Sequence, residues 1–419
     1  MARNQHNRLY YGFIIAALGF LIQAIFWGTY RSFGLFFNPL LNEFGWSRAE
    51  LAGAASMGWL VVGLMNFPAG AAVDRFGPRR TLTICGTLFG LGYVLMSGVQ
   101  GLWQVYAFYI VMAIGMSAAD VVPLSTIARW FARKRGTVTG IAKIGTGIGM
   151  MSTPLLASYL IDTYGWRTSY VVLGGGAIIA LVLMAQFIRR DPSKMGLHAY
   201  GETLTPAGEK RPEQGIALRQ AVKTRQFATL CTAYLLVTTV AEVVMMHTVP
   251  HAVDMGISAP GAAGILSIIG ATSIAARAII GVLVDRLGSR KALLLCFLPQ
   301  LTSLIVLQFA DSLSALYIFA VFYGLSHGGF FTLLAPVIAQ LFGTISHGAL
   351  FGVIMAANGV GGALGPVLTG RAFDVFGSYR APFMALIGMG LMALLLVASL
   401  TRTPYQIETD VQEEPAAEH

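Results

Sequence analysis

Eight ionisable side chains of this chain lie inside long apolar runs, where an isolated charge is costly. Such a group is tolerated inside a membrane helix when it faces a water-filled cavity or a partner of opposite charge. Guanidinium and ammonium groups can bind an anion, whereas carboxylates and imidazoles can carry a proton. The eight residues are Arg31, Asp120, Lys143, Glu242, His247, His251, Arg277 and His327. A single wet cavity is the simplest common explanation for them.

The chain contains one pattern twice, at places about half its length apart. Both copies read G-x-x-x-D-R-x-G-x-R-[RK], and each stands between long apolar runs. The first copy is Gly70, Asp74, Arg75, Gly77, Arg79 and Arg80, and the second, 211 positions later, is Gly281, Asp285, Arg286, Gly288, Arg290 and Lys291. Pro154 and Pro366, like Asp162 and Asp374, are 212 positions apart. Such a repeat in a hydrophobic chain is typical of a two-halved membrane transporter.

The composition indicates a membrane protein. The 419 residues are 56% hydrophobic and 11% charged, with a mean hydropathy of +0.68, whereas soluble proteins are about 25% charged. The net charge of +9 fits basic cytoplasmic loops, so we expect a lipid bilayer and no nucleic acid as the partner. Cys85, Cys231 and Cys296 lie in apolar runs, which indicates core residues rather than a disulfide or a metal site. No Walker loop or other enzyme motif is present, and no cofactor is expected.

Apolar runs long enough to cross a bilayer predict twelve helices. The predicted spans are about 10–38, 48–72, 80–99, 103–128, 136–160, 167–188, 226–252, 260–285, 290–309, 313–342, 347–371 and 380–401. We therefore predict an all-α membrane protein, with twelve transmembrane helices in two pseudo-symmetric six-helix halves. The predicted parts are an N-terminal half at 1–190, a polar cytoplasmic linker at 191–225, a C-terminal half at 226–401 and an acidic cytoplasmic tail at 402–419.

Lys and Arg residues are concentrated in the loops on one side of the predicted bundle. The positive-inside rule puts these loops, and both ends of the chain, in the cytoplasm. The first apolar stretch is longer than a signal segment, so no cleavable signal peptide is expected. We expect a multi-pass protein of the plasma membrane, or of the inner membrane in a bacterium, that functions as a monomer.

These features resemble the major facilitator superfamily across essentially the whole chain. The two Asp-Arg-Gly-Arg loops match the superfamily motif between helices 2 and 3 and between helices 8 and 9. The resemblance implies a transporter whose cytoplasmic ionic contacts help to hold the outward-open state. An Asp at a helix end that faces Arg residues can form a partly buried pair, which breaks as the two halves rock.

Within the superfamily the chain looks most like the monocarboxylate transporters and the oxalate/formate antiporters. The resemblance rests on Trp130-Phe131-Ala132-Arg133-Lys134-Arg135-Gly136 leading to Gly140 and Ala142, on Arg277 at the position of a substrate-binding Arg, and on Tyr30-Arg31-Ser32 where the group has a substrate-contacting Lys. Two positions depart from relatives in the group: Ser273 replaces a proton-accepting Asp, and Asn358 replaces a Lys of the oxalate exchanger. The second departure argues against exchange of divalent oxalate.

Arg277 and Arg31 are the candidate anion-binding residues. Arg277 lies about eight residues from the predicted cytoplasmic end of helix 8, near mid-membrane, and its planar guanidinium suits a two-pronged contact with a carboxylate. The structural alternative is a buried pair with Asp120 or Glu242. Arg31 could be a second anion contact, could form an external gate with its repeat equivalent Glu242 (31 + 211 = 242), or could extend to the outer surface.

The candidate residues for proton coupling or gating are carboxylates, a lysine and two histidines. Asp120 could carry the proton, and a static pair with Lys143 on the adjoining helix is the alternative. Glu242 is a gating candidate as the equivalent of Arg31. His247 and His251, four residues apart, share one helix face and could be polar lining, local hydrogen-bond partners or a pH-linked gate.

Four further residues complete the predicted substrate site. His327 lies midway along helix 10 beside backbone-exposing glycines, and it is expected to line the cavity. Tyr323 and Phe331 are the aromatic candidates around it, although such side chains more often pack in a core. Asn358 stands at the position of the exchanger's helix 11 Lys.

The favoured function is secondary active transport of a small organic anion by alternating access. Cations in a mostly apolar cavity fit a carboxylate with an apolar body, and co-transport of H⁺ would offset its charge. We therefore predict proton-coupled symport of a lactate- or pyruvate-like monocarboxylate. The alternatives are an organic anion antiporter, a drug/proton antiporter and a transporter-like nutrient sensor.

Overall fold

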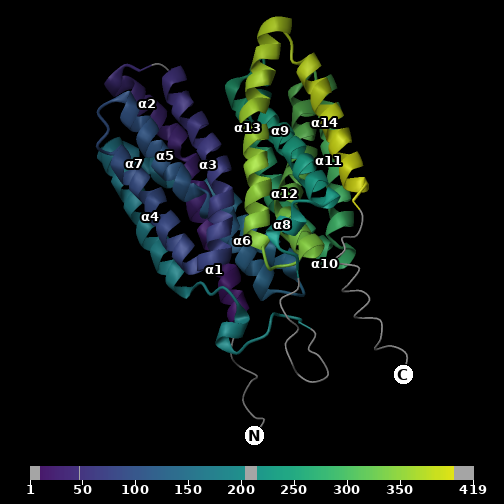
Figure 1. Ribbon diagram of the computed structural model, residues 1–419. Coiled ribbons are helices and arrows are strands. Elements are labelled where there is room, and N and C mark those ends of the chain that lie inside the picture. Colours follow the sequence, from purple (N-terminus) through teal and green to yellow (C-terminus); the bar gives the residue numbers. More distant parts are fainter. Residues whose placement is uncertain (1–9, 47, 203–214, 401–419) are drawn as a thin grey trace.

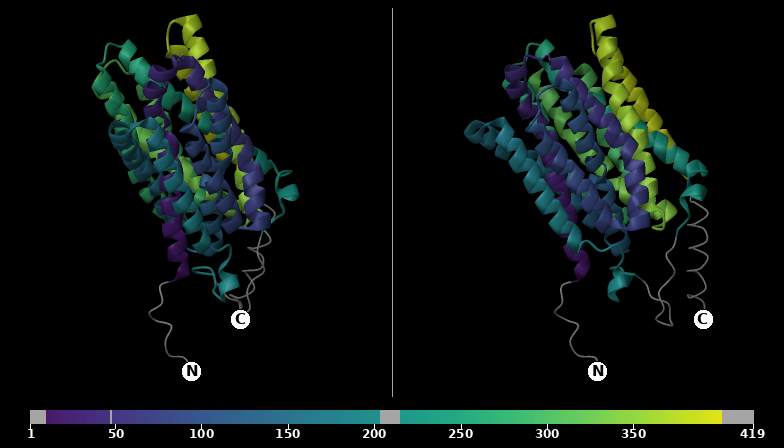
Figure 2. Two further views of the ribbon diagram at one scale, coloured as in Figure 1. Left: turned by 90° about the vertical axis from the view of Figure 1, so that its left-hand side faces the viewer. Right: turned by 60° about the vertical axis from the view of Figure 1, so that its left-hand side comes forward.

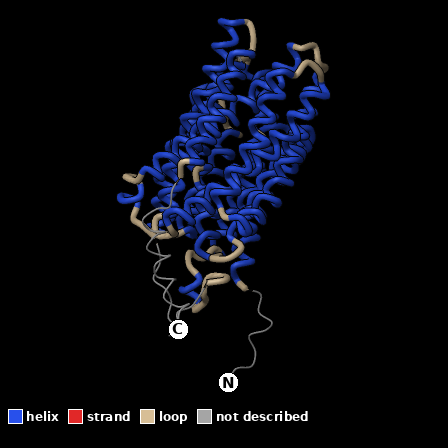
Figure 3. Tube along the Cα trace, turned by 90° about the vertical axis from the view of Figure 1, so that its right-hand side faces the viewer, coloured by secondary structure: helices blue, strands red, loops and turns tan. Residues whose placement is uncertain are grey.

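The computed structural model describes residues 10–46, 48–202 and 215–400. The predicted acidic tail at 402–419 and part of the predicted linker, 203–214, lie outside the described residues. Figure 1 shows two bundles of helices side by side, the first coloured purple to teal and the second green to yellow. The described residues contain helices and two isolated bridges but no strand, and loops gather at the two ends of the bundles (Figure 3).

The first bundle is formed by the N-terminal half of the chain. Its helices are α1 (Tyr11–Arg31), α2 (Phe33–Phe44), α3 (Arg48–Phe76), α4 (Pro78–Met96), α5 (Leu102–Met116), α6 (Ala118–Trp130) and α7 (Arg135–Phe187). A 3-10 turn, η1 (Pro192–Met195), follows α7. The pair α1 and α2, like the pair α5 and α6, forms one span with a local break, and α7 contains two helices joined at a bend.

The second bundle is formed by the C-terminal half. Its helices are α9 (Arg225–Asp254), α10 (Ala259–Leu287), α11 (Ser289–Phe309), α12 (Leu313–Phe342), α13 (His347–Phe376) and α14 (Arg380–Ala398). The short helix α8 (Leu218–Ala221) precedes them. In the views of Figure 2 the helices of both bundles run in the same general direction, as membrane-crossing helices do.

The predicted twelve spans are confirmed. Ten stretches of the described residues are long and apolar enough to cross a membrane. One of them is the 53-residue α7, which is two spans, and α4 supplies the remaining one. Several helices exceed their apolar runs: α3, for example, was predicted to end at 72 and continues to Phe76. Charged residues can extend a helix past its apolar run because the backbone hydrogen bonds do not depend on the side chain.

Large apolar side chains cover the outside of the protein, while several charged groups are buried. Leu155, Phe309 and Leu395 are 73%, 76% and 69% exposed, whereas Lys143 and Arg277 are 3% and 5% exposed. In a soluble protein, large apolar side chains are mostly buried and charged side chains are mostly exposed. In a bilayer, lipid tails cover the apolar surface, and the internal charges must find partners or water within the protein.

The two ends of the bundle differ in charge. We call the end that carries the α3–α4, α6–α7 and α10–α11 connections the basic end, because these residues lie there: Arg79, Arg80, Arg133, Lys134, Arg290 and Lys291. The opposite end, which carries the bend of α7 and the α13–α14 connection, is called the far end. The described parts of the predicted linker pack on the basic end: Tyr200 pairs with the end of α6 through Trp130, and Ile216 N donates to Phe342 O of α12 at 3.1 Å.

Three glycines turn the chain sharply between spans. Gly77 and Gly288, both from the repeated motif, have φ/ψ of 86°/162° and 80°/156° and join α3 to α4 and α10 to α11. Gly165 has 78°/162° and bends α7 at the far end. This backbone region is essentially open to glycine alone. It explains why glycine occupies this position in both copies of the motif.

A cluster of polar side chains at the far end fastens α2 to the bend in α7. Glu43 accepts hydrogen bonds from Arg167 Nη1 at 2.6 Å and from Trp166 Nε1 at 2.8 Å. These donors hold the pKa of the Glu43 carboxyl below its usual range. Because both partners follow Gly165 directly, the cluster depends on the bend at that glycine.

The bend predicts a difference between two glycine-to-alanine variants of α7. Gly165→Ala should destabilise the protein by about 1–3 kcal/mol, because alanine cannot adopt this backbone conformation without strain. Gly175→Ala is the matched control: it lies within a helix, and a methyl group at either position would have no other atom within 4 Å. The measurement is the thermal unfolding midpoint in detergent, which should fall only for Gly165→Ala. Equal midpoints for the two variants would contradict the strained bend.

Candidate functional site

A cavity lies between the two halves. It contains about 1050 Å³ of space between atoms, its opening included. Helices α1, α3, α5, α6 and α7 supply one side, and α9, α10, α12 and α13 supply the other. The lining residues are Trp27, Arg31, Trp59, Val62, Gly63, Asn66, Met116, Ala119, Asp120, Lys143, Thr146, Met150, Thr238, Glu242, Met245, Arg277, His327, Phe331, Met355, Asn358, Gly359 and Gly362. Most of the predicted site residues are therefore brought together here.

Most of the lining residues occupy equivalent positions in the two halves. At an offset of 211 the pairs are Trp27 with Thr238, Arg31 with Glu242, Asn66 with Arg277, Met116 with His327 and Asp120 with Phe331. At an offset of 212 they are Lys143 with Met355, Thr146 with Asn358 and Met150 with Gly362. The cavity thus lies on the pseudo-symmetry axis that relates the halves. The repeat was the signal that could have predicted Asn66 and Thr146, which the sequence analysis did not identify.

Asp120, near the start of α6, is the centre of a buried polar cluster. Its Oδ1 accepts hydrogen bonds from Lys143 Nζ at 2.5 Å, Gln23 Nε2 at 2.6 Å and Trp27 Nε1 at 3.4 Å. Thr146 Oγ1 donates to Gln23 Oε1 at 2.7 Å. The Asp120–Lys143 pair, one of the two alternatives from the sequence, is therefore present. Gln23 was not identified, because a lone amide in an apolar run gives no pattern to detect.

Arg277 of α10 lies against the backbone of the other half. Its Nη1 donates to the backbone oxygen of Lys143 at 2.9 Å. Its Nε has no hydrogen-bond partner among the described residues. Among the same residues, the Arg277 guanidinium forms no ion pair with Asp120 or Glu242. The sequence left open a buried pair of Arg277 with Asp120 or Glu242. The described residues of this conformation do not contain that pair. A buried guanidinium with an unused N–H beside a cavity can take a carboxylate in a two-pronged contact.

Arg31 and Glu242 both line the cavity but do not form an ion pair in this conformation, as far as the described residues extend. The Arg31 guanidinium lies over the rings of Trp27 and Trp59, 5.9 and 5.5 Å from their centroids. Such cation–π contacts hold the positive charge without an anion. Glu242 keeps an unused carboxylate toward the cavity.

His327, Phe331 and Asn358 complete the side of the cavity formed by the C-terminal half. His327 Nδ1 is 3.4 Å from Ser273 Oγ, and its ring packs on Phe331 with centroids 4.9 Å apart. Asn358 Nδ2 contacts Met355 Sδ at 3.6 Å, while its Oδ1 has no hydrogen-bond partner among the described residues. These groups can orient a polar part of a ligand. None of the three adds a fixed charge to that of Arg277.

Three predicted residues lie elsewhere and are not among those that line the cavity. Tyr323 is buried in the core of the C-terminal half, and its hydroxyl donates to Ala241 O at 3.2 Å. His247 bonds within the same half, to Pro366 O at 2.9 Å and to the Tyr379 hydroxyl at 3.3 Å. His251 packs its ring against Tyr379. Of the three roles that the sequence left open for His247, this arrangement is that of a local hydrogen-bond partner.

The repeated motif joins the halves at the basic end by capping helices. Asp74, at the end of α3, accepts hydrogen bonds from Gly348 N at 3.3 Å and Ala349 N at 2.8 Å, in the first turn of α13. Asp285, at the end of α10, accepts two N–H bonds of 2.8 Å from the first turn of α7. First-turn N–H groups have no partner within their helix and carry partial positive charge. Each half therefore caps a helix of the other.

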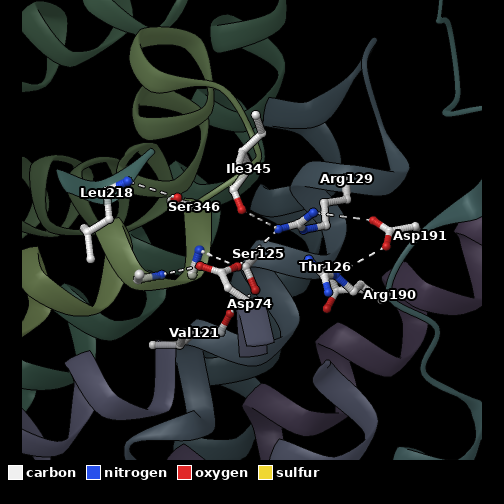
Figure 4. A network of polar contacts seen from close by, with 12 residues as sticks. Asp74, Val121, Ser125, Thr126, Arg129, Arg190, Asp191, Leu218, Ile345 and Ser346 are labelled. Atoms are coloured by element: carbon white, nitrogen blue, oxygen red, sulfur yellow. Dashed lines mark hydrogen bonds and ion pairs between the residues drawn. The ribbon is translucent and has the colours of Figure 1, made fainter. Parts of the chain in front are cut away.

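The ionic partner of Asp74 comes from outside the motif. Arg129 at the end of α6 donates from Nη2 to Asp74 Oδ1 and to Ile345 O, both at 3.1 Å, and its Nη1 lies 3.5 Å from Asp191 (Figure 4). The sequence predicted a pair between an Asp at a helix end and facing Arg residues, and did not say which arginines. Arg129 directly precedes the Trp130 segment, and the sequence gives no sign of this role, because its reach across the helices is a property of the packing.

The basic residues of the motif act within their own halves. Arg79 Nε donates to Gln186 at the end of α7 at 3.0 Å, and Arg290 Nη2 donates to Ala398 O at the end of α14 at 2.6 Å. Arg75 lies over the ring of Phe76. The remaining three are exposed: Arg80, Arg286 and Lys291. Among the described residues, no ion pair joins these basic side chains to Asp74 or Asp285.

Close glycine contacts join the halves in the lining of the cavity and at the basic end. A Cβ on Gly63 of α3 would lie 2.9 Å from the Cα of Gly359 of α13, and a Cβ on Gly136 of α7 would lie 2.6 Å from the oxygen of Gly281 of α10. The backbones are therefore in direct contact. The hydrogen bonds between described residues of the two halves also lie toward this end. The ribbons of the two halves are farther apart at the far end (Figure 1). The lining of the cavity includes Arg31, the last residue of α1 at the far end, whereas the cross-half caps lie at the basic end. We infer from the lining and the caps that the cavity opens toward the far end.

The comparison with protein families agrees with this architecture. The model of the Major Facilitator Superfamily matches residues 16–301 and, again, residues 230–418. The chain belongs to this superfamily. Its solved relatives have the same fold: the proton:xylose symporter XylE aligns with a TM-score of 0.76 at 15% identity, over 95% of this chain and 98% of the symporter. The human organic anion transporter MFSD10 aligns with a TM-score of 0.73 at 14% identity, over 92% and 99%.

Among curated proteins, this superfamily member is similar to proteins named as monocarboxylate transporters and as an oxalate:formate antiporter. Human monocarboxylate transporter 11 is 28% identical over 394 residues, which are 89% of this chain and 79% of the relative. Monocarboxylate transporter 13 of Bos taurus is 26% identical, over 92% of this chain and 89% of the relative. The oxalate:formate antiporter of Oxalobacter formigenes is 26% identical, over 86% and 85%. The chain is thus a multi-pass membrane transporter and not an enzyme.

The capping network predicts that Asp74→Asn weakens closure of the basic end. The variant loses a charged acceptor of two N–H bonds and an ion pair, and hydrogen bonds to charged groups contribute about 1.5–3 kcal/mol each. We therefore expect an increase of about tenfold or more in the population with a separated basic end. Spin labels at exposed Lys194 and Lys223, with the three native cysteines changed to serine, would report it as a longer distance by double electron–electron resonance.

The control for this prediction is Glu43→Gln. It makes the matched carboxylate-to-amide change in an exposed ion pair that lies within one half, at the far end. Its distance distribution should equal that of the wild type. An unchanged distribution for Asp74→Asn as well would show that the capping network does not control closure.

Proposed function

We propose that this transporter is a proton-coupled symporter of monocarboxylates, which acts by alternating access. The observation that carries the proposal is the state of Arg277, a buried guanidinium at the cavity whose Nε is unused by the described residues. A carboxylate can occupy that edge with two parallel hydrogen bonds. The relatives named as monocarboxylate transporters and as an oxalate:formate antiporter support a small organic anion as the substrate.

The charges that line the cavity favour a substrate with one negative charge. Asp120 is paired with Lys143, and the charge of Arg31 is held by the rings of Trp27 and Trp59. Among the described lining residues this leaves Arg277 as the cation with neither an ion pair nor a ring contact and with an unused N–H. A monocarboxylate neutralises Arg277, whereas a dicarboxylate would add a further negative charge in a low-dielectric pathway, where it is costly.

Glu242 is the proposed proton carrier, in preference to Asp120. The Asp120 carboxylate is held by three donors, so taking up a proton there would disrupt an ion pair and two hydrogen bonds. Glu242 faces the cavity without a hydrogen bond or ion pair to the described residues. It can therefore gain and lose a proton without breaking a contact, and its neutral form crosses the apolar pathway at lower cost.

The proposed orientation has the basic end in the cytoplasm. The positive-inside rule assigns the loops rich in Arg and Lys to that side, and both chain ends with them. The cavity then opens to the outside in this conformation, and the capping network is the inner barrier. The proposed location is the plasma membrane. The proposed functional unit is a monomer.

Arg277→Lys tests the two-pronged contact. Lysine keeps the charge but lacks the planar fork, so uptake of radiolabelled lactate into proteoliposomes under an inward proton gradient should fall at least about tenfold. Arg167→Lys is the control, because that arginine lies in an exposed pair at the far end. Wild-type uptake by Arg277→Lys would remove this residue from the substrate site.

Glu242→Gln tests the proton coupling. The variant should lose the stimulation of lactate uptake by the proton gradient but retain exchange of internal for external lactate, because exchange needs no net proton movement. Glu43→Gln is the matched control outside the cavity. If the gradient still stimulates uptake by Glu242→Gln, the proton travels on another group. If wild-type uptake ignores the gradient and requires an internal anion, the protein is an antiporter.

A further inference from the structure

The N-terminal half has a second cavity, which is an open groove with a volume of about 380 Å³. Residues within 65–76 of α3 and 80–88 of α4 line it, together with residues at the α5–α6 junction such as Ser117. The volume is within the range of about 300–1000 Å³ that ligand pockets have. Because the lining residues Phe76 and Ile84 are 54% and 61% exposed, the groove faces outward, where lipid surrounds the protein.

The groove is separate from the central cavity, although the same helices line both. Met65 and Ser117 line the groove, whereas the adjacent residues Asn66 and Met116 line the central cavity. Adjacent residues of a helix point in different directions, so each helix can present one face to each space. A ligand of the groove is therefore not a substrate on its way through the cavity, and its identity does not depend on the proposed function.

The groove is apolar over most of its length and positively charged at one end. It extends from Met65 and Leu88 to Phe76 and Arg80, which is about 16 Å along α3 and about 12 Å along α4 at a rise of about 1.5 Å per residue. This length is about half of the hydrocarbon core of a bilayer, which is about 30 Å thick, and so corresponds to one leaflet. Arg80 stands at the basic end, and none of the described residues that line the groove is a carboxylate.

The guanidinium of Arg80 is available to an anion. Its side chain is exposed, and it forms no hydrogen bond or ion pair with the described residues. Arg75 lies over the ring of Phe76, 5.2 Å from its centroid, which puts a second guanidinium beside the groove. Arg79, in contrast, donates to Gln186 within the same half. An apolar groove one leaflet long with guanidinium groups at its end matches an anionic phospholipid, because arginine binds phosphate oxygens well.

The internal repeat indicates which side chains make room for this groove. At the positions equivalent to Ala69 and Ala72 of the lining, the C-terminal half has Ile280 and Leu283. Larger side chains at these points take up the space that alanine leaves open. The repeated motif places a basic residue at the same point in both halves, so the room beside that charge is what distinguishes the N-terminal half.

We propose that the groove between α3 and α4 binds one phospholipid with an anionic head group, from the leaflet at the basic end. An acyl chain lies along Ala69 and Ala72, and the phosphate binds to Arg80. Burial of the chain supplies affinity in proportion to the apolar area that it covers. The guanidinium supplies a preference for a negatively charged head group over a zwitterionic one.

The test compares two lipids with the same chains, dioleoylphosphatidylglycerol and dioleoylphosphatidylcholine. Native mass spectrometry of the protein in detergent gives the dissociation constant of the first lipid that binds. We expect the anionic lipid to bind at least about fivefold more tightly, which is the effect of about one basic residue near an anionic head group. Equal dissociation constants would overturn the proposal in favour of ordinary boundary lipid. Glycerol 3-phosphate binding as tightly as the anionic lipid would overturn it in favour of a free anion.

Arg80→Gln tests the contact with the head group. The variant should bind the two lipids equally, because the charge that distinguishes them has lost its partner. Lys291→Gln is the matched control, since it removes the equivalent cation of the other half and should keep the preference. If both variants lose the preference, it belongs to the general charge of the basic end and the specific site is wrong.

Ala72→Leu tests the place of the acyl chain. It puts into the groove the side chain that stands at the equivalent position of the other half, and it leaves Arg80 unchanged. We expect the dissociation constant of the anionic lipid to rise at least about tenfold, because less of the chain can be buried. Ala385→Leu, at an exposed residue of α14, is the control and should bind as the wild type does.

The thermal unfolding midpoint without added lipid shows whether each variant is folded. Binding of the anionic lipid by a folded Ala72→Leu variant as tightly as by the wild type would remove the chain from the groove and overturn the proposal. If Ala72→Leu lowers the midpoint, Arg80→Gln and Lys291→Gln, which change no packed side chain, still decide the question.

Discussion

The arrangement of this transporter depends on a carboxylate at the end of one helix that caps the first turn of a helix in the other half. Asp74 caps α13 and Asp285 caps α7, so the contact is formed twice, once in each direction. A cap of this kind is strong because it joins a full negative charge to N–H groups that otherwise lack partners. It is also local and reversible, because it involves two carboxylates rather than a large apolar surface. Such contacts suit a barrier that must open.

The rest of the interface between the halves follows from this constraint. The helices can reach one another's first turns only if their backbones approach closely, and glycines such as Gly63, Gly136 and Gly359 permit that approach. The closed end then forms the floor of the cavity. Arg277 spans the halves there through the Lys143 carbonyl. A substrate at Arg277 would therefore bind beside the contacts that must change during transport, which gives a physical route for substrate to influence closure.

Much of the fold and part of the site could be predicted because a bilayer restricts the possible structures. Long apolar runs have to be helices, so twelve spans and two halves followed from hydropathy and the repeat. Charges inside those runs are costly, so Asp120, Lys143 and Arg277 were recognisable as residues that must face a partner or a cavity. The repeat even predicted the relation between Arg31 and Glu242 as equivalent positions. Gln23 escaped prediction because a neutral amide in an apolar run breaks no rule.

The amino-acid sequence by itself determined the helices, their pairing into halves and the identity of the intramembrane charges, because each follows from local hydrophobicity and from a repeat along the chain. Only the tertiary structure decided which charges meet. Arg129 rather than the motif's arginines joins Asp74, and Lys143 rather than Arg277 pairs with Asp120. Tyr323, His247 and His251 face the interior of one half and not the cavity. The direction in which a side chain points depends on the rotation and tilt of each helix, which are set by packing against its neighbours.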